Sequence, residues 1–197
     1  MRQETGSNLT IDNKKVSIQV KLGGLSFSAD SVVVPNGVEH VEFVVDTPRV
    51  TLAPYNEVVL DTAAELLRIV GKPCRGNELC VCSELQSDVV AVMAINAAAL
   101  HSIMELQGVR VSFTSPLLDM RHCDQNCLTV DVSEKVCYVR VFDYGLQCAE
   151  AFEMATAEDV LGIVAELLDG NDIPIYIKGD TKAVKLLRKY YKRVICE

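Results

Sequence analysis

The stretch that decides the fold is residues 127–153, which read CLTVDVSEKVCYVRVFDYGLQCAEAFE. Two mostly apolar runs are separated by the polar triplet at 133–135, and a third run follows Tyr144-Gly145. Short runs rich in Val, Tyr and Phe, separated by turn-forming residues, are typical of β-hairpins. The stretch predicts three antiparallel strands, with Asp131 at the end of the first. Their expected ranges are 127–132, 135–143 and 146–153.

The residues after this stretch predict helices alternating with strands. Thr156 and Asp159 have the spacing of a capping box, and apolar residues then recur at the helical period through 157–169. A strand at 173–177, a helix at 181–191 and a short strand at 193–196 complete the order βββαβαβ. Parallel strands need helices as crossovers, so this order predicts an α/β, ribonuclease-H-like unit.

The first half of the chain is expected to repeat the same order. Gly23-Gly24 lies between two alternating runs and predicts a hairpin turn, and Thr62 with Glu65 predicts a second capping box. The run 89–95 is apolar throughout, which favours a strand buried on both faces. Two such units in tandem predict the actin-like ATPase arrangement. The strands expected in this half are 16–22, 25–34, 38–46, 49–53, 89–95 and 109–113, with helices at 62–70 and 96–106.

Composition and charge restrict the partners and the location. The chain has 197 residues and a formal net charge of −8, which disfavours binding to nucleic acid without help from other groups. No apolar run approaches the ~20 residues that a membrane span requires. The polar start lacks the apolar core of a secretory signal, so we expect a cytoplasmic protein. The expected organisation is a flexible arm at 1–13, a first lobe at 14–119 and a second lobe at 120–197.

The cysteines allow two interpretations. Most of the eight lie inside apolar runs, as reduced core cysteines do in a cytoplasmic protein. A zinc site would use His122, Cys123 and Cys127, with Cys74 or Cys80 as a further ligand. Zinc sites normally show two tightly spaced ligand pairs, and only one loose pair is present. We therefore expect no bound metal.

Several motifs, in their order and spacing, resemble a family of Bacteroidetes proteins catalogued only as a numbered domain of unknown function. That resemblance implies a compact actin-like ATPase fold over nearly the whole chain. The arrangement is more distantly similar to type IV pilus assembly ATPases and to cell-division proteins of the actin class. The motifs are SIQVKLGGLSFS (17–28), TPRVTLAP (47–54), TSPLLD (114–119), the hairpin at 128–145, FEMATAEDVL (152–161) and IPIYIKGD (173–180).

The resemblance also implies where a nucleotide would bind, and the chain departs from that pattern. The first hairpin should carry an aspartate that serves magnesium, but Lys21 stands there, and a lysine cannot hold a cation. In the second hairpin Asp131 is kept, whereas Ser133 and Glu134 replace the glycines that let phosphate approach the backbone. If a nucleotide binds, the implied residues are Gly23, Gly24, Ser26, Asp131, Ser133, Gly179 and Asp180.

Three functions follow in order of preference. The first is a non-catalytic binding or scaffold protein with degenerate phosphate loops, no catalytic residues and no cofactor. The second is a divergent ATPase that binds ATP and magnesium, related to pilus-assembly or cell-division ATPases. The third is a ribonuclease-H-like nuclease that would place two metals on Asp131, Glu158 and Asp180.

The last predicted helix carries a basic face. Lys182, Lys185 and Lys189 stand at i, i+3 and i+7 and so share one side, while Ala183, Val184, Leu187, Tyr190 and Tyr191 are expected to face inward. Such a face is most simply a solvated surface near a helix C-terminus. The functional hypothesis is that these three lysines dock an acidic protein partner.

Overall fold

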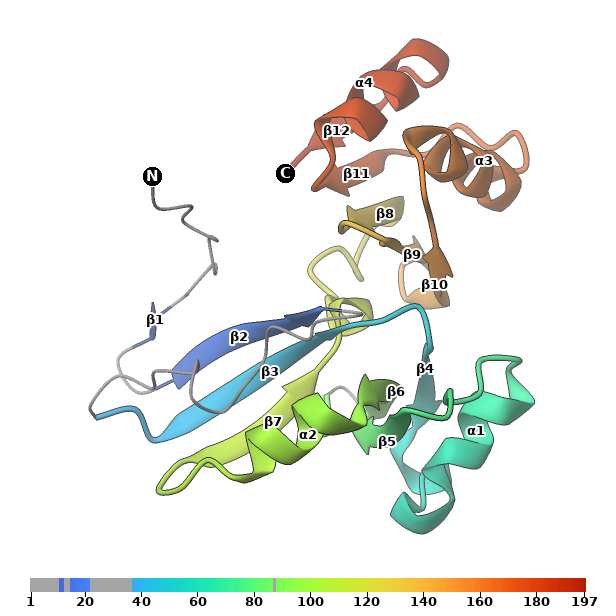
Figure 1. The fold of residues 1–197 in the computed structure, drawn as a ribbon. Helices are drawn as coiled ribbons and strands as arrows, with labels where there is room; N and C mark the ends of the chain where they lie inside the picture. Colours follow the sequence, from blue (N-terminus) through green and yellow to red (C-terminus); the bar gives the residue numbers. More distant parts are fainter. Residues whose placement is uncertain (1–10, 13–14, 22–36, 87) are drawn as a thin grey trace.

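A computed structural model describes residues 11–12, 15–21, 37–86 and 88–197. Figure 1 shows the second half of the chain, coloured yellow to red, stacked on the first half. Among the described residues, no helix combines the length and apolar character needed to cross a membrane.

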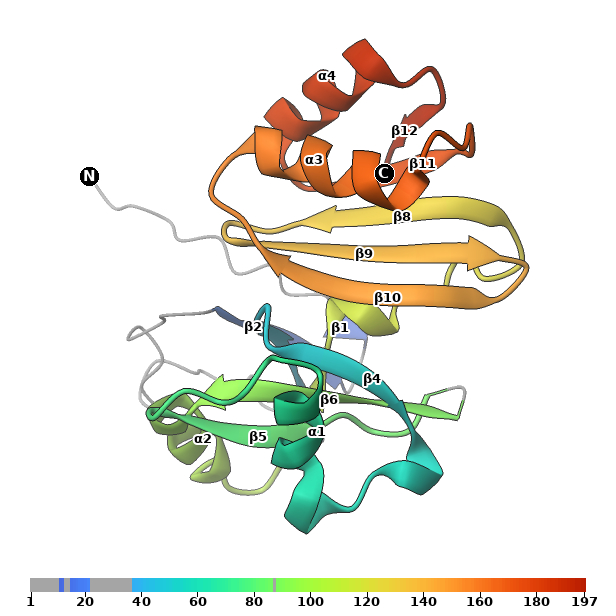
Figure 2. The same cartoon turned by 90° about the vertical axis from the view of Figure 1, so that its right-hand side faces the viewer.

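The second half folds as the sequence predicts. Strands β8 (Asn126–Val132), β9 (Val136–Asp143) and β10 (Leu146–Glu153) are antiparallel, and β11 (Ile175–Lys178) and β12 (Val194–Cys196) are added in parallel. The sheet order is β10-β9-β8-β11-β12. Helices α3 (Ala157–Leu168) and α4 (Thr181–Tyr190) both lie on one face of the sheet (Figure 2). The βββαβαβ prediction is therefore confirmed for this half.

Local signals explain this agreement. The Thr156 hydroxyl accepts a hydrogen bond from Asp159 N, and the Asp159 carboxylate accepts one from Thr156 N, so the capping box forms. Along β8 and β9 the side chains alternate between two faces. Val130 and Val139 pack under the helices, whereas Tyr138 points toward the first half.

The first half has a different topology from the one predicted. Strand β2 (Lys15–Lys21) pairs in parallel with β3 (His40–Asp46), and β3 pairs in parallel with β7 (Arg110–Thr114). The prediction that 38–46 is the third strand of an antiparallel meander is therefore wrong. Alternating apolar residues in 38–46 predict a strand but do not fix the direction of its neighbours, and here the neighbours on both sides are parallel to it.

Two predictions in this region fall on residues that are not described. The strand at 25–34 and its Gly23-Gly24 turn lie outside the described residues. So does most of the predicted arm at 1–13, within which β1 (Ile11–Asp12) pairs antiparallel with the start of β2.

A separate antiparallel sheet stands between β3 and β7 in the chain. It contains β4 (Val50–Pro54), β6 (Val89–Asn96) and β5 (Glu78–Cys82), in the order β4-β6-β5. Strand β6 is buried on both faces, as predicted. Its two neighbours are nevertheless antiparallel to it, because the burial of a strand does not determine the direction of the strands beside it. The accompanying helices are α1 (Ala63–Ile69) and α2 (Ala97–Met104), with short 3₁₀ turns η2 (Tyr55–Glu57), η3 (Leu60–Thr62) and η4 (Pro116–Leu118).

The two predicted helix caps in the first half have opposite outcomes. Asn96 caps α2 by accepting hydrogen bonds from Ala98 N and Ala99 N. The capping box predicted from Thr62 and Glu65 does not form, because the Thr62 hydroxyl donates to Val59 O and Glu65 pairs with Arg68. Asn96 is the last residue of strand β6 and keeps an extended backbone, whereas Thr62 still belongs to the preceding 3₁₀ turn.

The halves share one hydrophobic core. Val136, Tyr138 and Ala151 of the second half pack into the same cluster as Phe43 and Met93 of the first. Figure 2 shows β10 alongside β4 at this junction. A second cluster lies wholly between the second sheet and helices α3 and α4. Residues on both sides of the expected boundary at 119/120 thus contribute to one packed interior.

Candidate functional site

A cavity of about 640 Å³ lies between the two halves, and we call it the central cavity. Its polar lining comes from the ends of several strands, with Gln19 on β2, Asp46 on β3, Asp131 on β8 and Lys178 on β11. Asp119, just after η4, completes this set. Strand ends that meet at a cleft are where α/β proteins usually bind ligands. The central cavity is therefore the first candidate site.

Asp131 is held by two cations within the second half. The Arg140 Nη2 atom lies 2.6 Å from Asp131 Oδ2, and Lys178 Nζ lies 3.1 Å from Oδ1. Asp131 is 6% exposed and Arg140 only 2%. The Arg140 Nε donates to Thr129 Oγ1, and its Nη1 donates to the Pro116 carbonyl. Both carboxylate oxygens of Asp131 are thus already neutralised, and a metal ion would have to displace a buried arginine.

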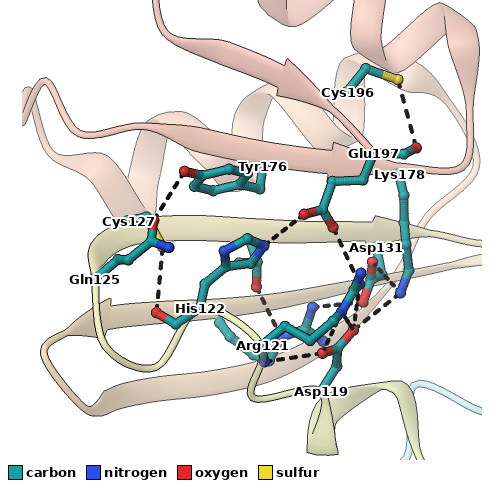
Figure 3. Close-up of polar contacts among 12 residues, drawn as sticks. Asp119, Arg121, His122, Gln125, Cys127, Asp131, Tyr176, Lys178, Cys196 and Glu197 are labelled. Carbon is teal, nitrogen blue, oxygen red and sulfur yellow. Dashed lines mark hydrogen bonds and ion pairs between the residues drawn. The ribbon is translucent and has the colours of Figure 1, made fainter.

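A chain of ion pairs continues from Lys178 to the end of the sequence (Figure 3). Lys178 Nζ lies 3.3 Å from Asp119 Oδ2, and Arg121 donates to both oxygens of the same carboxylate. Burial opposes ionisation of Asp119, but the hydrogen bonds from Arg121 and the charges of Arg140 and Lys178 hold its pKa below the usual value. Arg121 also pairs with Glu197 at 3.2 Å.

Asp46 lines the central cavity and is one of the site residues that sequence reasoning missed. Its Oδ1 accepts hydrogen bonds from Ser133 Oγ at 2.9 Å and from the Tyr138 hydroxyl at 2.8 Å. The Tyr138 oxygen also accepts a hydrogen bond from Thr47 N at 2.8 Å. We call Asp46, Thr47, Ser133 and Tyr138 the polar latch, because these bonds join β3 of the first half to the β8–β9 hairpin of the second. Burial, and then the Asp46 charge, raise the pKa of Tyr138 well above its usual value.

A second cavity, of about 670 Å³, lies on the other side of the β8–β9 turn, and we call it the α4 cavity. Ser133 and Glu134 line both cavities, whereas Asp131 and Gly179 line only the central cavity and Asp180 only the α4 cavity. The structure thus distributes the predicted nucleotide residues over two cavities separated by the turn. Gly23, Gly24 and Ser26 lie outside the described residues.

Gly179 and Asp180 have local structural roles. Gly179 has φ +104°, and a Cβ at this position would lie 1.9 Å from the Val132 carbonyl oxygen. Only glycine allows β11 to approach the hairpin so closely. The Asp180 Oδ1 accepts a hydrogen bond from Lys182 N at 2.8 Å, which caps α4. Neither residue needs a ligand to explain it.

The residues of the nuclease hypothesis do not meet. Asp131 lines the central cavity, whereas Glu158 and Asp180 line the α4 cavity. A two-metal site needs carboxylates around ions about 4 Å apart, so this arrangement does not favour that chemistry.

The zinc hypothesis also lacks a shared site. His122 Nε2 bonds Glu197 Oε1 at 2.6 Å, and its ring stacks on Tyr176 with centroids 4.0 Å apart (Figure 3). Cys74 and Cys80 instead pack against the small core beneath α1. In the described part of the chain, no three His, Cys, Asp or Glu side chains are grouped so as to hold a metal ion.

The basic face of α4 is present. Ala183, Val184 and Leu187 are buried, as predicted, and Tyr191 packs against the same core. Tyr190 is 66% exposed, so its predicted inward position is wrong; at the end of the helix the contact with the core is made by Tyr191, four residues after Leu187, and Tyr190 points away from it. Three lysines of this helix, Lys182, Lys185 and Lys189, line the α4 cavity together.

Comparison with solved structures identifies the fold. A Bacteroides thetaiotaomicron protein described as having an actin-like ATPase fold and unknown function matches with a TM-score of 0.63 and 19% identity, covering 81% of this chain and 69% of that one. A type IV pilus biogenesis complex, PilM–PilN, matches with a TM-score of 0.50 and 13% identity, over 81% of this chain and 69% of that one. No family model and no curated protein matches the sequence. At these identities the matches show the fold alone: the chain is a mixed α/β protein with an actin-like ATPase fold.

Proposed function

We propose that this chain is a non-catalytic binding or scaffold protein whose nucleotide cleft is closed by its own side chains. One observation carries the proposal. The β8–β9 turn, which in a working ATPase would wrap a phosphate, bonds Asp46 across the cleft through Ser133 Oγ at 2.9 Å. The Asp131 carboxylate beside that turn is already paired with Arg140 and Lys178.

The residues present do not fit a magnesium-bound nucleotide. Magnesium binds carboxylates that can complete an octahedral shell of oxygen ligands, but both oxygens of Asp131 are within 3.1 Å of a cation. Glu134 lines both cavities at the point where a polyphosphate would pass, and two like charges repel there. A divergent ATP-binding ATPase remains the second candidate, because Asp131 still stands at the end of β8 in the central cavity.

The test is a thermal-shift titration with ATP and magnesium. A ligand that binds only the native state stabilises it by about 2.7 kcal/mol at a hundredfold excess over Kd, which corresponds to a rise of several degrees in Tm. We expect millimolar magnesium-ATP to leave Tm almost unchanged, as magnesium alone does. A rise of several degrees that disappears in Asp131→Ala would overturn the scaffold proposal and favour the ATP-binding alternative instead.

Three further points belong to this proposal. The parallel strands β2, β3 and β7 correspond in order to β8, β11 and β12, which supports a tandem duplication that diverged in the connections of the first half.

We also propose membership in the Bacteroidetes family that the motifs resemble, and a cytoplasmic location. The partner is proposed to be an acidic protein that contacts Lys182, Lys185 and Lys189.

A further inference from the structure

Strand β5 has two cysteines on one of its faces. Cys80 and Cys82 are alternate residues of this strand, so their side chains point to the same side and their Cα atoms are about 6.8 Å apart. Both side chains are partly buried against the small core beneath helix α1, which packs on β5 (Figure 2). We call these two residues the thiol pair.

The two thiols interact with each other. A hydrogen bond from the Cys80 thiol lowers the pKa of Cys82, although the partial burial of Cys82 acts in the opposite direction. The same hydrogen bond, followed by burial, raises the pKa of Cys80. When Cys82 ionises, the thiol pair therefore holds one proton between two sulfur atoms and has a single negative charge.

The spacing of the thiol pair does not favour a disulfide. The Cα atoms of a disulfide usually lie about 4.4–6.8 Å apart, so residues two apart on an extended strand are at the upper limit. Strand β5 stays in register with β6 from Glu78 to Cys82, and a direct S–S bond of about 2 Å would have to distort it. A bridging metal ion relieves this strain, because two metal–sulfur bonds of about 2.3 Å span about 4.6 Å.

The neighbouring side chains limit such an ion to two ligands. Glu78 is on the same face of β5, but both of its carboxylate oxygens accept hydrogen bonds from Arg49. Within the residues that the structure describes, no three His, Cys, Asp or Glu side chains are grouped so as to hold a metal ion. Structural zinc is almost always bound by four ligands. Soft thiolates instead select Cu(I), which forms linear complexes with two of them.

We propose that the thiol pair binds Cu(I) as a linear, two-coordinate site. One Cu⁺ ion displaces the proton that the two sulfurs share, so that a Cu–S bond forms at each sulfur, the S–H bond breaks and H⁺ leaves to solvent. No oxidant or reductant takes part, because copper enters and stays as Cu(I). One monovalent cation replaces another, so the charge of this half-buried pair does not change. The inference is independent of the proposed binding function and needs neither a nucleotide nor a partner.

The test is an anaerobic titration of the full chain with Cu(I) in competition with bicinchoninate, a chelator whose Cu(I) complex is coloured. The exposed Cys123 and Cys196 are replaced by serine in every sample, so that they do not contribute copper binding. We expect the chain to retain one Cu(I). Cys80→Ser and Cys82→Ser should each weaken binding by more than the roughly 10–100-fold that loss of an outer-shell group costs.

The matched control is Cys148→Ser, which makes the same change at a partly buried thiol of another sheet. It should leave copper affinity unchanged, and so should Cys74→Ser, although Cys74 packs on the same small core as the thiol pair. X-ray absorption of the copper-loaded chain should show two sulfur neighbours, and this measurement does not depend on whether the serine variants fold. Retention of copper by Cys80→Ser or Cys82→Ser, an equal loss in Cys148→Ser, or a third sulfur neighbour would overturn the inference.

Discussion

The two halves place a lysine and an aspartate side by side on adjacent parallel strands, but in opposite order. In the first half, Lys21 on β2 is in register with Asp46 on β3. In the second half, Asp131 on β8 is in register with Lys178 on β11. Each half therefore keeps one carboxylate at the cleft, on a different strand of the equivalent pair.

The partners of the two carboxylates come from different places. Asp131 is paired with Arg140 and Lys178, both in its own sheet. Asp46 Oδ1 accepts hydrogen bonds from Ser133 and Tyr138, both in the other half, and its Oδ2 accepts a longer one, of 3.4 Å, from Gln19 of its own half. One carboxylate thus stabilises the second half itself, and the other joins the halves. Asp131 thus serves the folding of one half and Asp46 the assembly of the two halves, although the two carboxylates stand on non-equivalent strands.

The largest effect is expected when the ion pair between Asp131 and Arg140, within the second half, is broken. Arg140→Met should lower the free energy of unfolding by about 3 kcal/mol, because it leaves Asp131 buried with only the partly exposed Lys178 as a charged partner. Urea denaturation measures the change. The matched variant Lys178→Met should cost about 1 kcal/mol or less, since that side chain is 40% exposed. A loss below about 1 kcal/mol for Arg140→Met would show that Asp131 does not depend on the buried pair.

A smaller effect is expected at the polar latch. Tyr138→Phe should cost about 1–2 kcal/mol, because it removes a donor to Asp46 and leaves Thr47 N without its acceptor. Hydrogen exchange of the Thr47 amide should accelerate. Tyr176→Phe removes a hydroxyl whose bond to Gln125 lies within the second half, so it should leave Thr47 exchange unchanged. If both variants accelerate that exchange alike, the latch does not act between the halves.

The difference between the halves also explains how far the sequence could be interpreted. In the second half, local sequence patterns mark most of the elements in turn. Turn residues at 133–135 and 144–145 separate the strands, Thr156 begins a capping box, and apolar residues recur at the helical period through 157–169. The first half lacked a signal for strand direction. An apolar run such as 89–95 predicts a buried strand. However, the sequence of an antiparallel central strand that is covered on both faces has the same apolar pattern as that of a parallel strand.

The site was predicted in part. Asp131 and Gly179 line the central cavity, but Asp46 was missed because its partners lie 87 and 92 residues away. Such distances leave no local pattern, although Asp46 ends an apolar run just as Asp131 does. Arg140 could have been found: a turn at 133–135 places it opposite Thr129, on the same face of β8 as Asp131. A buried arginine there requires a carboxylate.

The smallest expected effect concerns Asp119, which shares Lys178 with Asp131. Its pKa in the folded protein is lowered, since the hydrogen bonds from Arg121 and the charges of Arg140 and Lys178 outweigh burial. A lowered pKa means that the ionised carboxylate stabilises the fold above its unfolded pKa of about 3.9 and that this stability is lost as the pH falls through the folded value. Asp119→Asn should therefore cost about 1 kcal/mol at pH 7, a magnitude discounted for the exposure of Arg121 and Lys178.

The cost of Asp119→Asn should shrink as the pH falls below about 4. Urea denaturation of both proteins between pH 7 and pH 2.5 measures this convergence, and Asp61→Asn, at an exposed carboxylate, controls for the loss of one negative charge. A constant difference across that range would mean that Asp119 acts through its shape and not its charge. In that case Arg140 and Lys178 would stabilise the charge of Asp131 and not that of Asp119. The difference between Asp131, which is paired with cations, and Asp46, which is held by hydroxyl groups of the other half, would then be larger.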